Sequence, residues 1–390
     1  MSPRVVHVIS NLGTGGAENM LLRLLEAESA GGRAGGHAVV SFMSGGALFG
    51  RIRDLGVELF ELGAARSLKT ALLLPDLIKV LRATRPDLIQ AWMYHANIAA
   101  SAGRVFVGGR PPVLWNIRQS VQALSNNSMR TRAVILAGTA LRASPAGIIY
   151  NSEVSAGQHE RLGYPRSKRI IVENGFEVSV APDREAARAL LMRALGLGDD
   201  ALLVGRVARK AGQKDDPTLF AAFRRVADRV PNAHLLLIGR GMRAEDADLA
   251  DLAAQCGHRD RVHFLGERLD VARLTPGFDA AVSSSAHSEG FSNVVAEAMA
   301  AGVPTVATDV GDAPRIVGDP HRIAPPRDPE ALSAALVRIL QAPPEARRAL
   351  GARDRQWIAD RFDMRAIAVR YRALWDETAG QTHIQNNKTL

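Results

Sequence analysis

The stretch that decides the fold spans residues 280–309 and reads AAVSSSAHSEGFSNVVAEAMAAGVPTVATD. An apolar run at residues 280–284 predicts a strand, a helical segment follows, and residues 304–308 predict a second strand. Strands that are apolar throughout and alternate with helices are typical of a parallel sheet covered on both faces. The stretch therefore predicts an α/β domain.

The same alternation runs along the whole chain and restarts after residues 174–176. Before this point the predicted strands are residues 5–10, 37–42, 57–62, 87–92, 113–117, 147–150 and 169–172. After it they are residues 202–207, 235–239, 262–266, 280–284 and 304–308. We therefore expect two Rossmann-like, doubly wound parallel-sheet domains that face each other across a cleft. In such sheets ligands bind beyond the carboxyl ends of the strands.

The predicted domain boundary lies at residue 175. The first domain would span residues 1–175 and the second residues 176–361, with a largely helical segment from about residue 328 to 377. We expect the helix at residues 362–379 to pack back on the first domain. Residues 380–390 show no periodicity, which predicts a disordered tail.

Composition points to a soluble globular protein. The chain has 390 residues, 47 % of them hydrophobic and 23 % charged, which is enough apolar material for two ordinary cores. The single Cys256 rules out an internal disulfide and a cysteine-based zinc cluster. The apolar runs fall far short of a membrane span, and residues 5–9 do not form a signal peptide. We therefore expect a cytoplasmic protein.

The excess positive charge lies in the first half of the chain. Residues 1–176 carry a net charge of +9, and the remainder is neutral. This asymmetry favours an anionic partner, such as a phospholipid surface or a phosphorylated acceptor. The alternative is an arginine-rich composition without functional meaning. Residues 128–142 leave a similar choice between a basic helix lying on a membrane and an ordinary domain helix.

The strongest chemical signal is the pair Glu289 and Glu297. The two are eight residues apart, a little over two helical turns, so we expect both carboxylates on one side of a helix. Free amides near the helix start, together with the helix dipole, would bind a diphosphate. One carboxylate could then bind sugar hydroxyls and the other a ribose. The alternative is a solvated helix with a capping carboxylate.

In this stretch the chain resembles glycosyltransferase family four, whose members have the GT-B fold of two Rossmann-like domains. The family signature, Glu-Gly-Phe-x-Asn-x-x-x-Glu-Ala-Met-Ala-x-Gly-x-Pro, is matched throughout by residues 289–304. The resemblance covers nearly the whole chain except the tail. It implies that Glu289 contacts the donor sugar and that Glu297 contacts the ribose. It also implies that Phe291, Ser292, Asn293 and Val294 belong to the donor-binding segment.

A second signal is the loop at residues 207–215, between a predicted strand and helix. Fixed cations there can stabilise the negative charge on a leaving phosphate without a metal. The family has an Arg/Lys pair in this loop, which Arg209 and Lys214 match, and Arg206 competes for the arginine role. The pair Asp246 and Asp248 is interpreted as a solvated helix face, so we expect no metal and no cofactor.

Two segments of the first domain also resemble the family. Gly15 and Gly16 match a glycine-rich loop that admits a phosphate or acceptor, and for Glu18 an acceptor contact and a helix-start role are equally open. The segment around His95 resembles one whose histidine lines the cleft near the donor sugar. We expect two further residues to face the acceptor, namely Asn116 and Arg118.

Three residues bear on the nucleotide. Arg240 stands where relatives often have an acidic residue, which leaves the base selectivity open. Leu265 and Gly266 match a position whose backbone usually contacts the base.

The resulting hypothesis is a retaining, metal-independent glycosyltransferase that uses a nucleotide-sugar donor and a glycan or polyprenyl-linked acceptor in bacterial cell-surface polysaccharide synthesis. We also expect weak contact with the inner face of the membrane. The alternatives are an epimerase-like enzyme of the same fold and a non-catalytic sugar- or lipid-binding subunit. Nucleic-acid binding is disfavoured because only 5 % of residues are aromatic.

Overall fold

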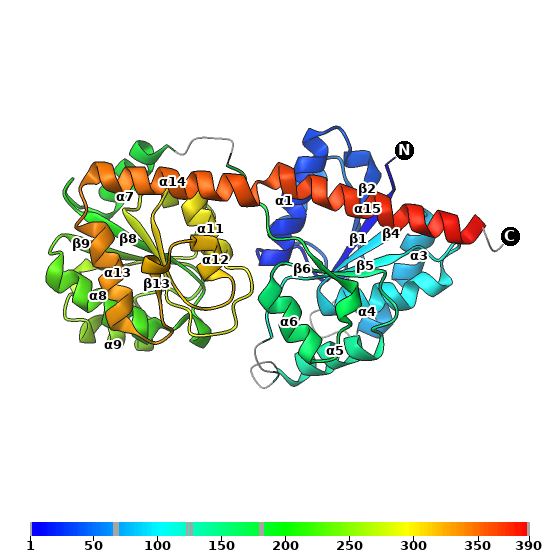
Figure 1. Cartoon of the computed structure of the whole chain (residues 1–390), viewed down its shortest axis with the longest axis horizontal. Coiled ribbons are helices and arrows are strands. Elements are labelled where there is room, and N and C mark those ends of the chain that lie inside the picture. The colour runs from blue at the N-terminus through cyan, green and yellow to red at the C-terminus, as the bar shows by residue number, and fades with distance from the viewer. Residues whose placement is uncertain (1, 65–69, 122–123, 125–127, 179–182, 388–390) are drawn as a thin grey trace. The chain divides into compact units, whose positions relative to one another are not determined.

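The computed structural model describes the backbone of residues 2–64, 70–121, 124, 128–178 and 183–387 (Figure 1). The chain forms two α/β units. The first contains Met1–Gly175 together with Met364–Leu390, and the second contains Phe176–Asp363. The chain passes from the first unit to the second after Gly175, where the sequence predicts the domain boundary. It returns to the first unit after Asp363, two residues beyond the predicted end of the second domain.

The first unit is built on a seven-stranded parallel sheet. Its strands are β1 (Val5–Ile9), β2 (His37–Ser41), β3 (Glu58–Glu61), β4 (Leu88–Trp92), β5 (Val113–Ile117), β6 (Gly147–Tyr150) and β7 (Arg169–Ile171). The order in the sheet is β3-β2-β1-β4-β5-β6-β7. Each of these strands is predicted by the sequence. Five of them, β1, β2, β4, β5 and β6, are buried throughout, and fully buried strands read as continuous apolar runs.

Helices cover both faces of this sheet. They are α1 (Gly16–Ala30), α2 (Phe49–Asp54), α3 (Leu74–Thr84), α4 (Met93–Gly103), α5 (Met129–Ala140), α6 (Glu153–Arg161) and α15 (Met364–Asn387), with short 3-10 turns η1 (Ala34–Gly36), η2 (Thr70–Leu73), η3 (Arg104–Phe106) and η5 (Arg166–Lys168). One apolar core lies between the sheet and α1, α2 and α15. The other lies between the sheet and α3 to α6.

The second unit is built on a six-stranded parallel sheet. Its strands are β8 (Leu202–Val207), β9 (Ala233–Ile238), β10 (Val262–Gly266), β11 (Ala280–Ser283), β12 (Thr305–Thr308) and β13 (Ile323–Ala324), in the order β10-β9-β8-β11-β12-β13. The sequence predicts all of these except β13. That strand has two residues, too few to form an apolar run.

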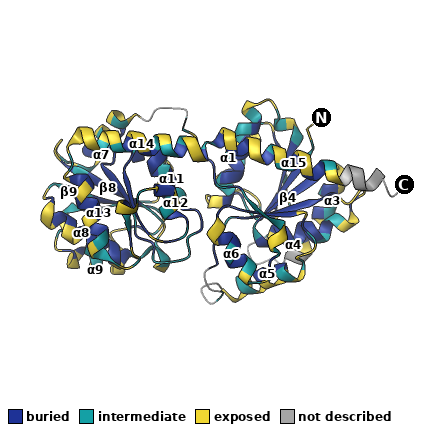
Figure 2. Ribbon diagram, in the orientation of Figure 1, coloured by how far each residue is buried: buried dark blue, intermediate teal, exposed yellow. Residues whose placement is uncertain are grey.

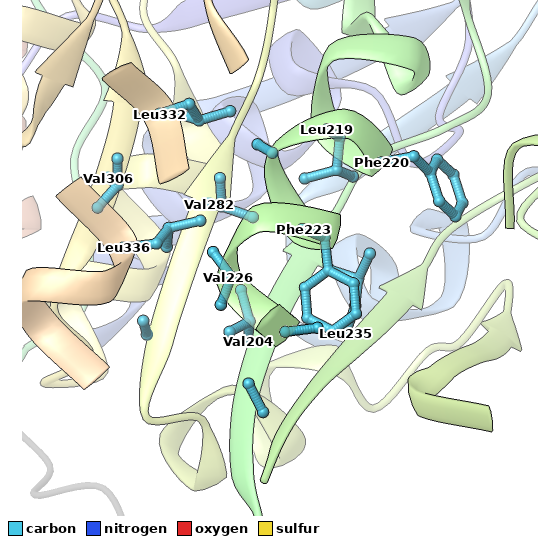
Figure 3. Close-up of a cluster of buried hydrophobic side chains, with 14 of the residues drawn as sticks. Val204, Leu219, Phe220, Phe223, Val226, Leu235, Val282, Val306, Leu332 and Leu336 are labelled. Carbon is cyan, nitrogen blue, oxygen red and sulfur yellow. The ribbon is translucent and has the colours of Figure 1, made fainter. Parts of the chain in front are cut away.

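The helices of the second unit are α7 (Arg184–Leu195), α8 (Asp216–Arg229), α9 (Ala247–Gln255), α10 (Val271–Leu274), α11 (Asn293–Ala300), α12 (Ala313–Val317), α13 (Pro329–Leu340) and α14 (Pro344–Phe362), with turns η6 (Gly212–Lys214), η7 (Arg259–Arg261), η8 (Thr275–Gly277) and η9 (Pro320–Arg322). The apolar side chains of α8 and α13 pack on one face of the sheet (Figure 3). Buried residues lie along the sheets and exposed ones on the outward sides of the helices (Figure 2).

Local signals fix several helix ends. Asp183 begins α7 by accepting a hydrogen bond from Ala186 N at 2.9 Å, and Gly196 ends it in the left-handed conformation with φ of 67°. Ser128 caps α5 in the same way, through Thr131 N. Such residue types make these particular helix ends readable from the sequence.

The C-terminal region differs from the prediction in one respect. The segment is divided into α13, α14 and α15, and α15 packs in the first unit through buried residues that include Tyr371 and Trp375. The expected disordered tail is wrong as far as Asn387, because α15 continues through Gly380 to that residue. Helical neighbours on both sides outweigh the low helix propensity of a single glycine. The last three residues lie outside the described part.

In both sheets the strand order reverses between two neighbours, β1 and β4 in the first unit and β8 and β11 in the second. At such a switch point the loops after the two strands leave in opposite directions and open a crevice at their carboxyl ends. Four of the segments singled out in the sequence follow these four strands. They begin near Gly13, Met93, Ala208 and Ser284.

Candidate active site

In the second unit, hydrogen bonds join the loops after β8 and β11. Ala286 N donates to Gln213 O at 2.9 Å, and Ser284 Oγ donates to Lys214 O at 2.8 Å. The switch point thus holds the loop with the predicted cations against the loop with the predicted sugar-binding carboxylate.

Lys214 and Glu289 form an ion pair across these two loops. Lys214 Nζ contacts Glu289 Oε1, and the side chains are 14 % and 13 % exposed, so both are reachable from solvent. Ser285 Oγ donates to the same carboxylate oxygen at 2.8 Å. Each charge therefore neutralises the other, and the lysine remains accessible to an anionic ligand.

The two candidate arginines of this region have different environments. Arg206 is buried, lies 2.6 Å from Asp216 and donates to Lys214 O at 3.1 Å. Burial lowers its pKa, and Asp216 opposes that shift. Arg209 is exposed, and its side chain has no hydrogen bond or ion pair with any described residue. Arg206 therefore stabilises the loop from the buried side through Lys214 O, and Arg209 is the arginine that a ligand can reach.

The geometry expected for Glu289 and Glu297 is wrong. Helix α11 begins only at Asn293, so Glu289 belongs to the preceding loop and not to the helix. This loop is held by Asp312 N, which donates to Gly290 O at 2.9 Å, and Ser288, with φ of 61°, is itself outside the helical conformation. The Glu289 carboxylate therefore faces Lys214, and its position is not set by the helix that carries Glu297.

Glu297 and Val294 lie on one side of α11 and line a pocket of about 380 Å³, including space open to solvent. Gly205 and Val207 of β8 and Ser283 of β11 line the same pocket, so it lies at the switch point. A pocket at this position, with a carboxylate in its wall, is suited to the polar groups of a nucleotide.

Ser292 precedes the first turn of α11. Its side chain makes no capping hydrogen bond, and its hydroxyl is buried without a partner among the described residues. The amides of a helix's first turn have no partner within the helix. An orphaned hydroxyl beside them is a second donor for an anion. Asn293 and Val294, which follow it, are partly exposed.

Phe291 corrects another expectation. Its ring is buried, stacks on Phe176 with centroids 5.8 Å apart, and meets Phe362 edge-on at 5.2 Å. An aromatic side chain in such a cluster contributes apolar burial to the core. The ring therefore anchors the loop and is not placed to touch a donor.

The loops after β8 and β9 are also joined by a backbone hydrogen bond and pack closely against each other. Lys210 N donates to Arg240 O at 2.8 Å, and a Cβ on Gly239 would collide with Ala208 O. The side chain of Arg240 is exposed. The pair Asp246 and Asp248 is not merely solvated, since both carboxylates contact Lys210, the latter at 2.8 Å.

Leu265 and Gly266 end β10 beside these loops. The pairing with β9 shifts between Phe264 and Gly266, so Leu265 is the extra residue of a bulge. A bulge leaves the backbone groups of its extra residue outside the ladder. Gly266 itself is engaged, because its carbonyl accepts from Gly239 N at 2.7 Å. The backbone available to a base is therefore that of Leu265.

In the first unit, α1 begins at Gly16, directly after β1 and its glycine-rich loop. The Glu18 carboxylate folds back over Gly15, where a Cβ would collide with it. Burial raises the pKa of Glu18, and hydrogen bonds from its own backbone and Asn11 oppose that shift. The carboxylate thus occupies the helix start, which leaves both sequence-based roles of Glu18 open.

His95 lies in the first turn of α4, directly after β4. Its side chain is exposed, while the surrounding protein still lowers its pKa by desolvation. Its neighbour Tyr94 is anchored in the core, with Oη 2.8 Å from His159 Nε2. Desolvation therefore favours the neutral form of the His95 imidazole.

Asn116 and Arg118 do not form an acceptor surface. Asn116 is fully buried and donates to Tyr371 Oη at 3.1 Å, so it ties β5 to α15. Arg118 donates to Asn116 Oδ1 and Asn174 Oδ1, both at 2.8 Å, and contacts Tyr371. Burial lowers the pKa of Arg118 to about 9. The two side chains are packed under α15, and the sequence gives no signal that this helix covers the end of β5.

Sequence reasoning missed Ser285, which supports Glu289, and three strained residues. Met93, Asp215 and Ser288 have φ of 68°, 51° and 61°. Left-handed conformations of non-glycine residues cluster at functional sites. Each of these lies one or two residues from His95, Lys214 or Glu289, but side-chain identity gives no signal of them.

Two family models match successive parts of the chain. One, described as a glycosyl transferase 4-like domain, matches residues 15–175, and one described as glycosyl transferases group 1 matches residues 198–342. Together they cover every strand of the two sheets except β1. The chain belongs to glycosyltransferase family four, and its two parallel-sheet domains are those of the GT-B fold.

Individual relatives agree with this assignment. The phosphatidyl-myo-inositol mannosyltransferase of Mycolicibacterium smegmatis is 33 % identical over 35 % of this chain and only 36 % of its own length. The lipopolysaccharide core biosynthesis glycosyltransferase LpsD of Rhizobium meliloti is 28 % identical over 76 % of this chain and 77 % of its own. Anabaena HepE in complex with UDP and glucose matches the fold with a TM-score of 0.82 at 18 % identity, over 96 % of this chain and 100 % of its own.

No helix in the described ranges combines the length and the apolar character that a membrane crossing requires.

Proposed function

We propose that this protein is a retaining, metal-independent glycosyltransferase that moves a sugar from a nucleotide-sugar donor to a glycan or lipid-linked acceptor. The observation that carries the proposal is the switch point of the second unit. There the loop that carries Lys214 and the accessible Arg209 contacts the loop that leads from Glu289 to the start of α11. Two cations and a helix N-terminus are suited to a diphosphate, and a carboxylate is suited to sugar hydroxyls.

In this proposal the diphosphate binds to Arg209, Lys214 and the first amides of α11, with Ser292 as an additional donor. Glu297 in the pocket wall binds the ribose, and the backbone of Leu265 contacts the base. Glu289, released from Lys214, binds the donor sugar, and His95 of the first unit contacts that sugar as a neutral imidazole. The acceptor binds the first unit near Gly15 and Gly16.

The chemical step needs little from the side chains except electrostatic stabilisation. The acceptor oxygen forms a bond to the anomeric carbon on the face that the phosphate leaves. The carbon–oxygen bond to the diphosphate breaks, and its electron pair goes to the phosphate oxygen. That oxygen also takes the acceptor's proton. Fixed cations that meet the developing charge lower the barrier, and for this reason we propose no metal and no cofactor.

The biological setting that fits these relatives is bacterial cell-surface polysaccharide or glycolipid synthesis, since one is named a lipopolysaccharide core biosynthesis glycosyltransferase and another a phosphatidyl-myo-inositol mannosyltransferase. We propose that the protein works in the cytoplasm and touches the inner face of the membrane weakly through its first unit. The net charge of +9 in residues 1–176 supports that contact.

The direct test is transfer from UDP-, GDP- and ADP-sugars, measured as released nucleoside diphosphate with and without a glycan acceptor fraction. Lys214→Ala should reduce transfer by roughly 100-fold or more, the scale of losing one group that stabilises the leaving charge. The control is Lys210→Ala, in the same loop, whose charge is already bound by Asp246 and Asp248.

Full activity in Lys214→Ala would remove the mechanism. Nucleotide release that needs no acceptor would instead favour the epimerase-like alternative. Failure to bind any nucleoside diphosphate would favour the non-catalytic binding subunit.

A further inference from the structure

Cations gather at the amino edge of the first unit's sheet, the edge opposite to the predicted ligand sites. They stand in the turns that precede β4, β5, β6 and β7. The members are Arg82 and Arg85, Arg104 and Arg110, Arg142, and Arg166 and Lys168. Because all four strands are parallel, these turns lie along one edge of the sheet.

Backbone carbonyls, not carboxylates, hold these side chains. Arg104 Nη1 donates to Ser144 O at 3.0 Å, and Lys168 Nζ donates to Ala143 O and Pro145 O at 2.7 and 2.6 Å. Neither cation forms an ion pair within the described residues. The sequence explains this, since residues 88–152 contain no aspartate or glutamate.

The cations are close enough to affect one another. Burial lowers the pKa of Arg104, and the charge of Arg110 lowers it further. Burial likewise lowers the pKa of Lys168, with Arg104 adding to the effect. Cations that repel one another without a counter-charge favour the binding of an external anion.

Two of the arginines also have unusual backbone conformations. Arg85 has φ of 47° and ends α3, and Arg110 has φ of 45° in the turn before β5. Glycine adopts this left-handed region without strain, whereas other residues do so at a cost. At both positions glycine would adopt the backbone conformation with less strain than arginine does.

Large apolar side chains lie exposed beside these cations. Val105 and Phe106 form η3 and are 51 % and 55 % exposed. Arg82 Nε donates to Phe106 O at 2.9 Å, and the neighbouring Arg104 reaches Ser144 just after α5. The two apolar residues therefore lie between the cations of α3 and those that follow α5. Further along α5, Leu136 and Met129 are 48 % and 75 % exposed.

We propose that this amino-edge surface, defined by Arg104, Val105, Phe106, Arg110, Arg142 and Lys168, docks on an anionic phospholipid bilayer. Val105 and Phe106 enter the interfacial region, and the unpaired cations contact lipid phosphates. Basic residues around exposed apolar side chains fit such an interface, where charge and apolar burial act together. A soluble polyanion would engage the charges and leave Phe106 in water.

This orientation has a consequence for the acceptor. The glycine-rich loop after β1 and His95 after β4 lie at the carboxyl edge, so they face away from the bilayer. A five-residue strand is roughly 16 Å long. The inference thus refines the proposed function towards an acceptor whose reacting sugar stands well clear of the lipid surface.

The test is co-sedimentation of the full chain with vesicles of phosphatidylglycerol and phosphatidylcholine, against phosphatidylcholine alone. The wild-type protein should bind the anionic vesicles and lose that binding as salt is raised. Phe106→Ser should weaken binding about tenfold, the scale of one aromatic side chain. Arg110→Gly with Arg142→Gln should weaken it roughly 30-fold, at about 1 kcal/mol for each cation.

The controls are Leu269→Ser, which removes a 93 % exposed side chain of the second unit, and Arg224→Gln with Arg225→Gln, two exposed cations of α8. Both should bind like the wild type. Arg110→Gly should keep the melting temperature, because it relieves the left-handed arginine. All variants should keep transfer between soluble substrates, so this result is separable from the proposed function. Equal losses in the controls, or binding to soluble polyphosphate but not to vesicles, would overturn the proposal.

Discussion

At the scale of single residues, the decisive property is whether a charged side chain is buried with a partner or accessible without one. Arg206 and Arg209 are three positions apart, and only the first is buried in an ion pair. Asn116 and Arg118 look like ligand-binding residues at the end of a strand, and both turn out to support α15. Residue type alone cannot separate these cases, because burial depends on helices that come from distant parts of the chain.

Asn116→Ala should therefore change stability rather than acceptor use. It removes the hydrogen bonds to Tyr371 and Arg118, and leaving such buried groups unsatisfied costs about 1–3 kcal/mol. Denaturant unfolding should show this loss, while the acceptor KM of the folded variant stays unchanged. Arg209→Ala is the matched contrast, with unchanged stability and reduced transfer. An acceptor KM that rises in Asn116→Ala at wild-type stability would restore the original interpretation.

Glu28 makes stability depend on pH. Burial alone would raise its pKa, but hydrogen bonds from His37, Arg33 and Arg372 outweigh that effect and lower the pKa from 4.5 to about 2. Because the folded pKa lies below the unfolded one, protonation favours unfolding. The stabilisation, of the order of 3 kcal/mol, is present above about pH 4.5 and is lost as the pH falls towards 2.

Glu28→Gln should remove this contribution. Urea unfolding at a series of pH values should show a lower free energy of unfolding at pH 7 and a weaker decline between pH 4.5 and 2 than in the wild type. The control is Glu26→Gln, two residues earlier on α1. The Glu26 carboxylate is partly exposed and pairs with the exposed Arg51. An identical pH profile in wild type and Glu28→Gln would show that the carboxylate is not stabilised in this way.

At the scale of elements, the loops at the ends of the strands, rather than the helices, set the geometry of the candidate site. The sequence places Glu289 at the entry of the helix that carries Glu297, whereas α11 starts four residues after Glu289. The strained Ser288 and the hydrogen bond from Asp312 to Gly290 hold the intervening loop. Helical periodicity alone does not locate the first residue of α11, because Gly290 and Ser292 are both residue types that are common at a helix start.

Ser292→Ala should have opposite effects on stability and on binding. The hydroxyl is buried without a described partner, so removing it should leave the free protein as stable or more stable by up to about 1 kcal/mol. Affinity for a nucleoside diphosphate should fall about tenfold, the loss of one hydrogen bond to a charged group. Thermal unfolding and calorimetric titration measure the two effects.

Ser333→Ala is the control, since Ser333 is also buried but donates to Glu330 O at 2.8 Å. That change should lower stability and leave nucleotide affinity as it is. A destabilised Ser292→Ala protein with normal affinity would mean that the hydroxyl serves the fold only.

At the scale of the whole molecule, the fold could be predicted almost completely from the sequence. Twelve predicted strands recur in the two sheets, because most of these parallel strands are buried and apolar along most of their length. The two-residue β13 and the continuation of α15 past Gly380 could not be predicted, since neither has a local signal of its own. For the candidate site, the sequence identifies the chain segments that contribute to it. Its contacts, such as Lys214 with Glu289, depend on loop conformations that only the structure supplies.

The central claim is that the switch point between β8 and β11 binds the diphosphate of a nucleotide sugar. The most direct measurement is an experimental structure of the protein with a bound nucleoside diphosphate. We expect both phosphates within hydrogen-bonding distance of Arg209, Lys214 and the first amides of α11, the ribose at Glu297, and the ion pair between Lys214 and Glu289 opened. A nucleotide bound elsewhere, with that ion pair intact and Arg209 free in solvent, would contradict it.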